Sequence, residues 1–206
     1  MTLLAVDAGP TEVTASLGDA RAARTLVPAA PHPGWAEIRA EDVWQAVLAT
    51  VREVVAAGVV PTRVALSGDP ATCALWDEET LGSPRPVITA DDRRTGSADL
   101  GPRLAWLAEH EPHTWALVEQ GRYAVGPVVS YVLARATRGL EHLLDPAGAG
   151  ATGLLDPATG AWAPPPGVPL DALPDLAAGP ELTGVTTDPG TFDGLALPVV
   201  RLAPTS

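Results

Sequence analysis

Asp7, Gly9 and Thr11 have the residue types and the spacing of a turn that can face a phosphate group. Asp7 ends a short apolar run, and a second strand-like run follows the turn. Gly9 allows a backbone conformation with positive φ, and Thr11 offers a hydroxyl and an N–H. Pro10 fixes φ and removes one backbone donor from the turn. The alternative is an ordinary β-hairpin in which Asp7 only caps the turn.

Few other side chains offer chemistry. The charge cluster from Asp91 to Arg94 has two interpretations, a binding site or a solvated ion-pair turn. His110 and His113 have helical spacing, but Pro112 interrupts the helix between them, so we expect no metal site there. Cys73 is the single cysteine, which excludes an internal disulfide, and its apolar context predicts burial. Every basic residue is an arginine, so no lysine is available for phosphate binding.

The composition limits the classes of protein to which this chain can belong. A chain of 206 residues with 46% apolar residues can bury a substantial core, and we expect one domain over 1–206. Its net charge of −12 argues against nucleic acid or an anionic membrane as a partner. No apolar run reaches the ~18 residues of a membrane span and no signal peptide is evident, so we expect a cytoplasmic protein. We interpret four tryptophans as packing residues rather than sugar platforms: Trp35, Trp44, Trp76 and Trp106.

The elements that would position these residues follow an α/β pattern. Apolar alternation predicts two strands and a tight turn over 3–19, and a third strand over 24–29. Helical apolar spacing with acids in the first turn predicts an amphipathic helix over 41–57, ended by Gly58. A buried strand is predicted at 63–68. This order predicts a mixed sheet with its first three strands antiparallel, flanked by helices, as in the ribonuclease-H-like fold.

The rest of the chain is less regular. Residues 74–77 and 85–88 flank a polar turn and predict a hairpin at the edge of the sheet. The stretches 145–153 and 162–169 are rich in Gly, Ala and Pro and predict loops. We expect helices at 102–110, 114–121 and 127–138, and late strands at 182–186 and 197–200.

Segments along most of the chain resemble the N-terminal domain of the FGGY-family carbohydrate kinases, in particular xylulokinases. The turn that begins at Asp7 is similar to the Asp-x-Gly-Thr-Thr/Ser loop of this family, which belongs to the actin-like ATPase superfamily. Residues 31–37 resemble its Pro-His-Pro and Trp-x-Glu pattern, and 88–95 its Ile-x-Trp-x-Asp-x-Arg segment. Further matches continue in family order as far as 194–200. The shared order and spacing support the resemblance more than any single match does.

The resemblance implies roles for individual residues. Asp7 is expected to help place Mg²⁺, and Gly9 and Thr11 are expected to face nucleotide phosphates. The sugar-side candidates are Asp69, Asp92 and Arg94.

Several positions depart from the family pattern. Pro10 replaces a threonine of the phosphate loop, and Pro70 and Ala71 replace polar residues that hold the sugar. Ala90 replaces an aromatic residue. Thr205 lies nearest the place of the catalytic aspartate, and a threonine cannot take a proton at neutral pH, so we expect no catalytic residue. The resemblance also predicts that the C-terminal FGGY domain is absent.

Three hypotheses follow. The chain is a binding or regulatory module that takes a small polyol, a sugar or a protein and is catalytically incompetent alone. Alternatively, it is the sugar-side half of an ATP-dependent carbohydrate kinase, using Mg·ATP when a separate FGGY C-terminal-domain chain or a homodimer completes it. A relic without a selected activity is the third.

Overall fold

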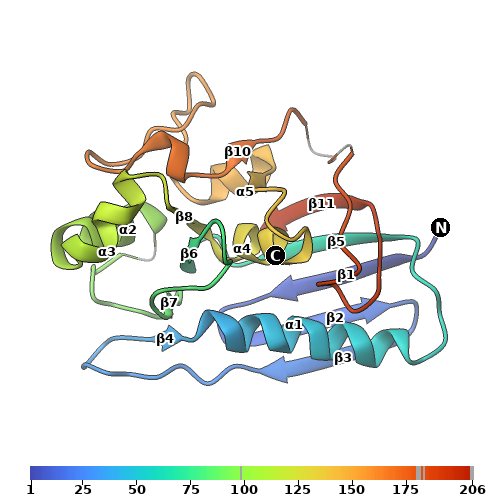
Figure 1. Ribbon diagram of the computed structural model, residues 1–206. Coiled ribbons are helices and arrows are strands. Elements are labelled where there is room, and N and C mark those ends of the chain that lie inside the picture. The colour runs from blue at the N-terminus through green and yellow to red at the C-terminus, as the bar shows by residue number, and fades with distance from the viewer. Residues whose placement is uncertain (98, 180–181, 183, 205–206) are drawn as a thin grey trace.

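The first three strands of the chain form an antiparallel meander that continues into a five-stranded sheet (Figure 1). The computed structural model describes residues 1–97, 99–179, 182 and 184–204. The sheet has the order β11-β5-β1-β2-β3, and β5 and β11 run parallel to β1. This mixed sheet with antiparallel first strands confirms the predicted fold class. Its strands are β1 (Leu3–Ala8), β2 (Glu12–Leu17), β3 (Ala20–Thr25), β5 (Arg63–Gly68) and β11 (Val199–Pro204).

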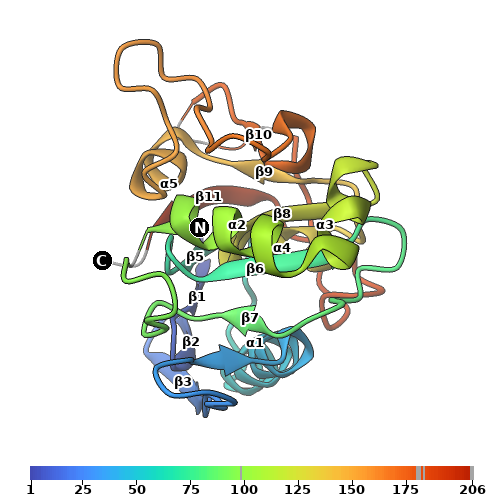
Figure 2. The same cartoon turned by 90° about the vertical axis from the view of Figure 1, so that its left-hand side faces the viewer.

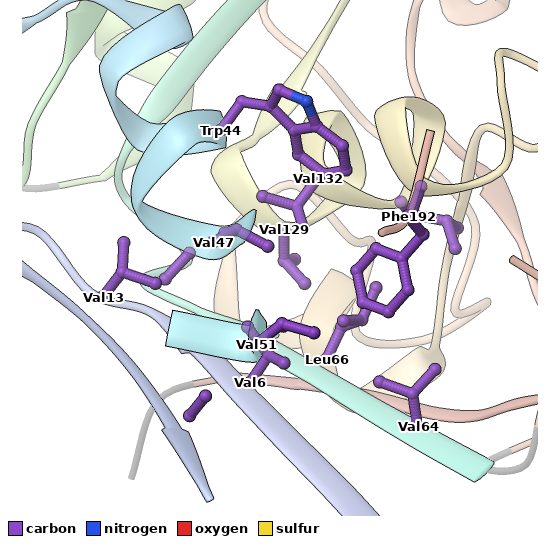
Figure 3. Packing of buried hydrophobic residues seen from close by; sticks show 14 of the residues in the cluster. Val6, Val13, Trp44, Val47, Val51, Val64, Leu66, Val129, Val132 and Phe192 are labelled. Atoms are coloured by element: carbon purple, nitrogen blue, oxygen red, sulfur yellow. The ribbon is translucent and has the colours of Figure 1, made fainter. Parts of the chain in front are cut away.

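Two helices cover one face of this sheet. In β1 and β5 every second residue is buried, and these residues pack against α1 (Ala40–Val55) and α4 (Val128–Ala136). Strict alternation is typical of strands with one face on a core. Figure 3 shows Val47 and Val51 of α1 above the sheet, with Phe192 completing the core. The other face carries the half-buried side chains of β1 and β5, including that of Asp7.

A second sheet lies on the far side of α4 (Figure 2). Eight of the nine residues of α4 are buried, because both sheets pack against this helix. The second sheet has the order β4-β7-β6-β8, and its other face packs against α2 and α3. Within the described residues, no helix has the length and apolar character needed to cross a bilayer. The elements of this part are β4 (Glu37–Ile38), β6 (Cys73–Asp77), β7 (Val87–Ile88), α2 (Leu100–His110), α3 (Pro112–Glu119) and β8 (Tyr123–Pro127).

Two strand predictions differ from the structure in position. β3 begins at Ala20 rather than at residue 24, and Ala22 is its single buried residue. An edge strand with one buried position shows too little apolar alternation to mark its bounds. The predicted hairpin of β6 and β7 does form, but in the second sheet, where β6 is an interior strand.

The stretch 145–153, predicted as a loop, contains the helix α5 (Pro146–Ala151). Asp145 caps it, because its Oδ1 accepts a hydrogen bond of 2.6 Å from the N–H of Gly148. The strand predicted at 182–186 is reduced, in its described part, to a single bridge between Thr186 and Pro198; Thr183 lies outside the described residues. The remaining elements are β9 (Leu143–Leu144), a 3-10 turn (Leu170–Ala172) and β10 (Asp175–Leu176), and β9 pairs with β10.

Candidate functional site

The carboxyl ends of three neighbouring parallel strands meet at one edge of the five-stranded sheet. Asp7 on β1 lies opposite Ser67 on β5, and Ser67 lies opposite Ala203 on β11. Ligands of open α/β sheets bind outside such carboxyl ends. We call this edge, together with the turn after β1 and the loop after β5, the strand-end site.

Asp7 and Ser67 contact each other in the strand-end site. Ser67 Oγ lies 2.5 Å from Asp7 Oδ1 and 3.3 Å from the backbone carbonyl oxygen of Val6. Both side chains are half-buried, because they alternate with the residues that face the helices. A hydroxyl on the neighbouring strand therefore takes part in holding the Asp7 carboxylate.

The turn after β1 leaves few donors for a phosphate. The Gly9 N–H donates to the Glu12 carbonyl oxygen at 2.9 Å, and Pro10 has no N–H. Gly9 does not use the positive φ that the sequence allows; instead, a Cβ there would lie 3.0 Å from the Glu12 carbonyl oxygen. Thr11 is exposed, and its hydroxyl and N–H make no hydrogen bond to the residues that the structure describes. Thr11 is thus the residue of this turn that can donate to a phosphate.

Asp69 shapes the loop after β5. Its N–H donates to the Ala8 carbonyl oxygen at 3.3 Å, which places the loop beside the end of β1. Its Oδ1 accepts from the N–H groups of Ala71 and Thr72, at 2.9 and 2.8 Å. Its Oδ2 makes no hydrogen bond within the described part of the chain and is able to accept one from a ligand. Pro70 and Ala71 add no polar side-chain group.

Arg103, on α2, joins the loop after β5 to the loop after β7 and was missed by the sequence reasoning. Its side chain is fully buried; Nη1 donates to the carbonyl oxygen of Ala71, and Nη2 donates to that of Ala90 at 3.0 Å. Burial lowers the pKa of this guanidinium, but an arginine remains charged at neutral pH. One sequence signal was available, because Arg103 falls on the helix face that carries Leu100 and Leu104.

Asp92 and Arg94 form a buried ion pair in the loop after β7. Arg94 Nη2 lies 2.7 Å from Asp92 Oδ2, and the two side chains are 1% and 0% exposed. Arg94 Nη2 also lies 2.7 Å from Glu37 Oε1, which accepts a second hydrogen bond from Arg85. Burial raises the pKa of Asp92, but hydrogen bonds from Arg94 and from the Ala36 N–H outweigh burial and hold this pKa below its usual range. Asp92 and Arg94 of the charge cluster therefore belong to a buried network, whereas Asp91 and Arg93 are exposed.

Two tryptophans complete the surroundings of Arg94. Its Cζ lies 3.7 Å from the ring centroid of Trp35 and 4.8 Å from that of Trp106. Cations over indole rings are stabilised by about 0.5–2 kcal/mol, more when water is excluded. Both rings are half-buried, whereas Trp44 and Trp76 are buried in the core. The packing interpretation therefore agrees with their positions.

A groove opens beside the loop after β7. Its volume is about 500 Å³, and Asp91 and Arg93 are its exposed charged residues. Asp92 belongs to its wall, whereas Arg94 is directed toward Asp92, Glu37 and Trp35. Direct sugar contact by Arg94 remains a prediction. The groove is lined by Ala90, Asp91, Asp92, Arg93, Gly96 and Ser97.

The residues of the strand-end site fit a magnesium ion that is held by one carboxylate. Among the described residues no group of three or more His, Cys, Asp or Glu side chains could enclose a metal. Mg²⁺ is commonly bound by one or two carboxylates with waters and substrate phosphates, and Asp7 is the carboxylate of this edge that would provide one such ligand. Burial raises the pKa of Cys73 to about 11, so this thiol stays protonated at neutral pH. Thr205, nearest the family's base position, lies outside the described residues.

Sequence relatives of this chain include glycerol kinases. The glycerol kinase of Methylibium petroleiphilum is 31% identical to it, over 98% of this chain and 48% of that protein. The glycerol kinase of Rhodospirillum centenum is 29% identical, over 97% of this chain and 47% of that protein. The chain thus spans about half the length of these curated relatives. No protein-family model matches it.

Solved structures share the fold. The Plasmodium falciparum glycerol kinase, solved with ADP, has a TM-score of 0.88 at 15% identity, over 98% of this chain and 48% of that one. A xylulose kinase from Brucella ovis has a TM-score of 0.81 at 22% identity, over 99% of this chain and 49% of that one. Taken with the glycerol kinases, these matches show that the chain belongs to the FGGY carbohydrate-kinase family, in which it fits an N-terminal domain.

Proposed function

We propose that this chain is a carbohydrate-kinase-like module that binds a small sugar or polyol at the strand-end site without transferring phosphate alone. The observation that carries the proposal is the pair of hydrogen bonds from Arg103 to the carbonyl oxygens of Ala71 and Ala90. They fix the loop after β5 against the loop after β7, so we expect these loops to be preorganised for a ligand. Preorganised loops lower the cost of binding.

The side chains of these loops favour binding over catalysis. Pro70, Ala71 and Ala90 have no group that could move a proton, and Asp69 Oδ1 is engaged by its own loop. Phosphoryl transfer depends on positioning and on charge stabilisation around the transferred group. Loss of a general base typically costs roughly 10²- to 10⁴-fold in rate. The side chains of the site are therefore better suited to binding a hydroxyl group than to activating one.

Mg·ATP, when bound, would supply the phosphoryl group. In this chain Asp7 would hold the metal, and Thr11 would donate to a phosphate. With Gly9 and Pro10 offering no free N–H, we expect weak nucleotide binding by this chain alone.

The test is a calorimetric titration of the purified chain with glycerol, xylulose and ribulose, with and without Mg·ATP, beside an assay for ADP formation. We expect saturable binding of one of these compounds, no ADP formation, and weaker binding by Asp69→Asn. Glu53→Gln, an exposed position on α1, is the matched control and should bind normally. Sugar-dependent ADP formation would contradict the non-catalytic proposal, and the absence of binding to any of the three would contradict the binding proposal.

A second candidate is supported by the length of the match. Because the chain aligns with 48% of a glycerol kinase, it could act as the sugar-side half of a kinase that a separate C-terminal-domain chain completes. Mixing it with the separately expressed second half of such a relative tests this idea. Phosphorylated polyol should form in the mixture and not with Asp7→Asn. No product at any mixing ratio would leave the binding module as the better proposal.

A further inference from the structure

We infer that the pocket at the start of α1 is a second ligand site, which takes a small oxyanion such as a phosphate or a carboxylate. Its volume is about 360 Å³, within the usual range for small-molecule sites. The start of α1, the turn before β7 and Tyr131 of α4 surround it. Among the described residues that line it, none belongs to the strand-end site or to the groove after β7, so the inference goes beyond the proposed function.

Arg39 brings a cation without a direct partner to this pocket. Its side chain is exposed and makes no hydrogen bond or ion pair with the residues that the structure describes. Glu41, whose charge lies near that of Arg39, has both carboxylate oxygens engaged, by Gln45 at 2.7 Å and by Arg135 at 2.9 Å. The planar guanidinium of an arginine matches the geometry of phosphates and carboxylates. Arg39 is therefore able to pair with an anion in the pocket.

Tyr131 contributes a buried hydroxyl whose proton has no acceptor within the described part of the chain. The residue is 1% exposed, and its oxygen accepts a hydrogen bond of 2.8 Å from Arg135 Nη1. The same Nη1 donates to Glu41 Oε2, so the hydroxyl lies at the Glu41 side of the pocket. A phenol donates as well as accepts, and a buried donor without an acceptor is unfavourable. A ligand oxygen in the pocket would accept this proton.

The start of α1 adds backbone donors. Ala40 and Glu41 are its first two residues, so their N–H groups have no partner within the helix, and they make no hydrogen bond to other described residues. The helix is 16 residues long, and its N-terminus carries a partial positive charge. Such N–H groups favour anions. With Arg39 and the Tyr131 hydroxyl, the pocket thus offers donors of three kinds and favours a ligand that only accepts.

Arg85 holds the opposite wall of the pocket in place. Its side chain is 8% exposed, and its nitrogens lie 2.8 Å from Glu37 Oε1 and 3.1 Å from Glu111 Oε2. A third contact is the hydrogen bond of 2.6 Å from Nη1 to the Pro86 carbonyl oxygen. Because two carboxylates compensate the charge of Arg85, we assign the attraction for an anion to Arg39. The contribution of Arg85 is a wall that is preorganised, which lowers the cost of binding.

The test is a calorimetric titration of the full chain with inorganic phosphate and with succinate, at constant ionic strength so that screening does not change. We expect saturable binding of at least one of the two anions. Arg39→Gln removes a charged donor and should weaken this binding by about 10- to 100-fold. Tyr131→Phe keeps the ring but removes the hydroxyl, and should weaken it by about 2- to 10-fold.

Arg21→Gln is the matched control, because it makes the same change in net charge at an exposed position of β3 and should bind like the wild type. Asp69→Asn alters the strand-end site and should also leave anion binding unchanged. Absence of saturable binding of both anions, or equal losses in Arg39→Gln and Arg21→Gln, would overturn the inference. Loss in Asp69→Asn without loss in Arg39→Gln would place the anion at the strand-end site and would overturn it too. Polyol binding is measured in a separate titration, so its failure leaves this inference standing.

Discussion

Arg103 Nη2 lies 3.0 Å from the carbonyl oxygen of Ala90, where α2 meets the loop after β7. The same guanidinium donates to the carbonyl oxygen of Ala71 in the loop after β5. Backbone carbonyls buried away from water need a donor, and one arginine supplies donors to both loops. The loop after β5 and the loop after β7 are thereby joined by a residue that is itself out of contact with solvent.

Replacing Arg103 should therefore destabilise the protein. In Arg103→Leu the two carbonyl oxygens lose their donor, and an unsatisfied buried group costs roughly 1–3 kcal/mol. We expect a loss of about 3 kcal/mol in the free energy of unfolding, measured by urea denaturation, and an intermediate loss for Arg103→Lys. Arg21→Leu, on an exposed part of β3, should change stability by less than about 0.5 kcal/mol. Similar losses for Arg21→Leu and Arg103→Leu would show that the hydrogen bonds of Arg103 to the two loops have no special role.

The buried pair of Asp92 and Arg94 should be sensitive to removal of one partner. Asp92→Ala leaves the Arg94 guanidinium buried with Glu37 as its remaining carboxylate, and breaking a buried pair costs about 3–5 kcal/mol. Because Glu37 remains, we expect the lower end of this range in thermal or urea unfolding. Glu53→Ala removes the partner of Arg24 in an exposed pair and should cost less than about 1 kcal/mol. Equal costs would contradict the assignment of a buried network.

His142 should make the protein less stable at acidic pH. Burial lowers its pKa from 6.5 to about 4, because the charged imidazolium is disfavoured beside Trp76. The unfolded chain therefore binds a proton more readily, so this stabilisation is complete above about pH 6.5 and is lost as the pH falls toward 4. His142→Phe should remove that part of the pH dependence, which is on the order of 3 kcal/mol.

The measurement is the melting temperature of wild type and His142→Phe at several pH values between 4 and 7. The difference between the two proteins isolates His142 from the carboxylates, which titrate in both. Parallel curves over this range would contradict the prediction.

Gly68 should not tolerate a larger side chain. A Cβ at this end of β5 would lie 3.1 Å from the Ala8 carbonyl oxygen and 3.1 Å from Val129 Cβ. Overpacking typically costs about 1–3 kcal/mol, so Gly68→Ala should lower the free energy of unfolding by that amount. Gly150→Ala, in α5, has no atom within 4 Å of the added Cβ and should be neutral or stabilising. Calorimetric melting of both variants compares them directly.

The parts of the fold that could be predicted are those in which the apolar spacing within one element is enough to identify it. The first two strands and α1 follow from apolar spacing alone, because each has one face on the core. α5 was missed because Gly148 and Gly150 are poor helix formers. The cap at Asp145 and the burial of Ala149 stabilise this helix, and neither is visible in the local helix propensity of the sequence.

The candidate site was only partly predictable, because its contacts join distant segments. Asp92 and Arg94 were identified by resemblance, but their burial depends on Glu37, which lies more than 50 residues earlier. Arg103 contacts Ala71 across 32 residues, and no local pattern indicates that contact. Spacing identifies residue types at strand ends, whereas it does not reveal which of them face each other.

The parallel pairing of β1 with β5 makes strand length as important as residue identity. Val6 and Ala8 face the core, whereas Asp7 between them faces the other side with Ser67. Side chains of a strand change face at every residue, so deleting one residue early in β1 would send the carboxylate inward and a valine outward. The turn after β1 can therefore change far more freely in evolution than the number of β1 residues that precede Asp7.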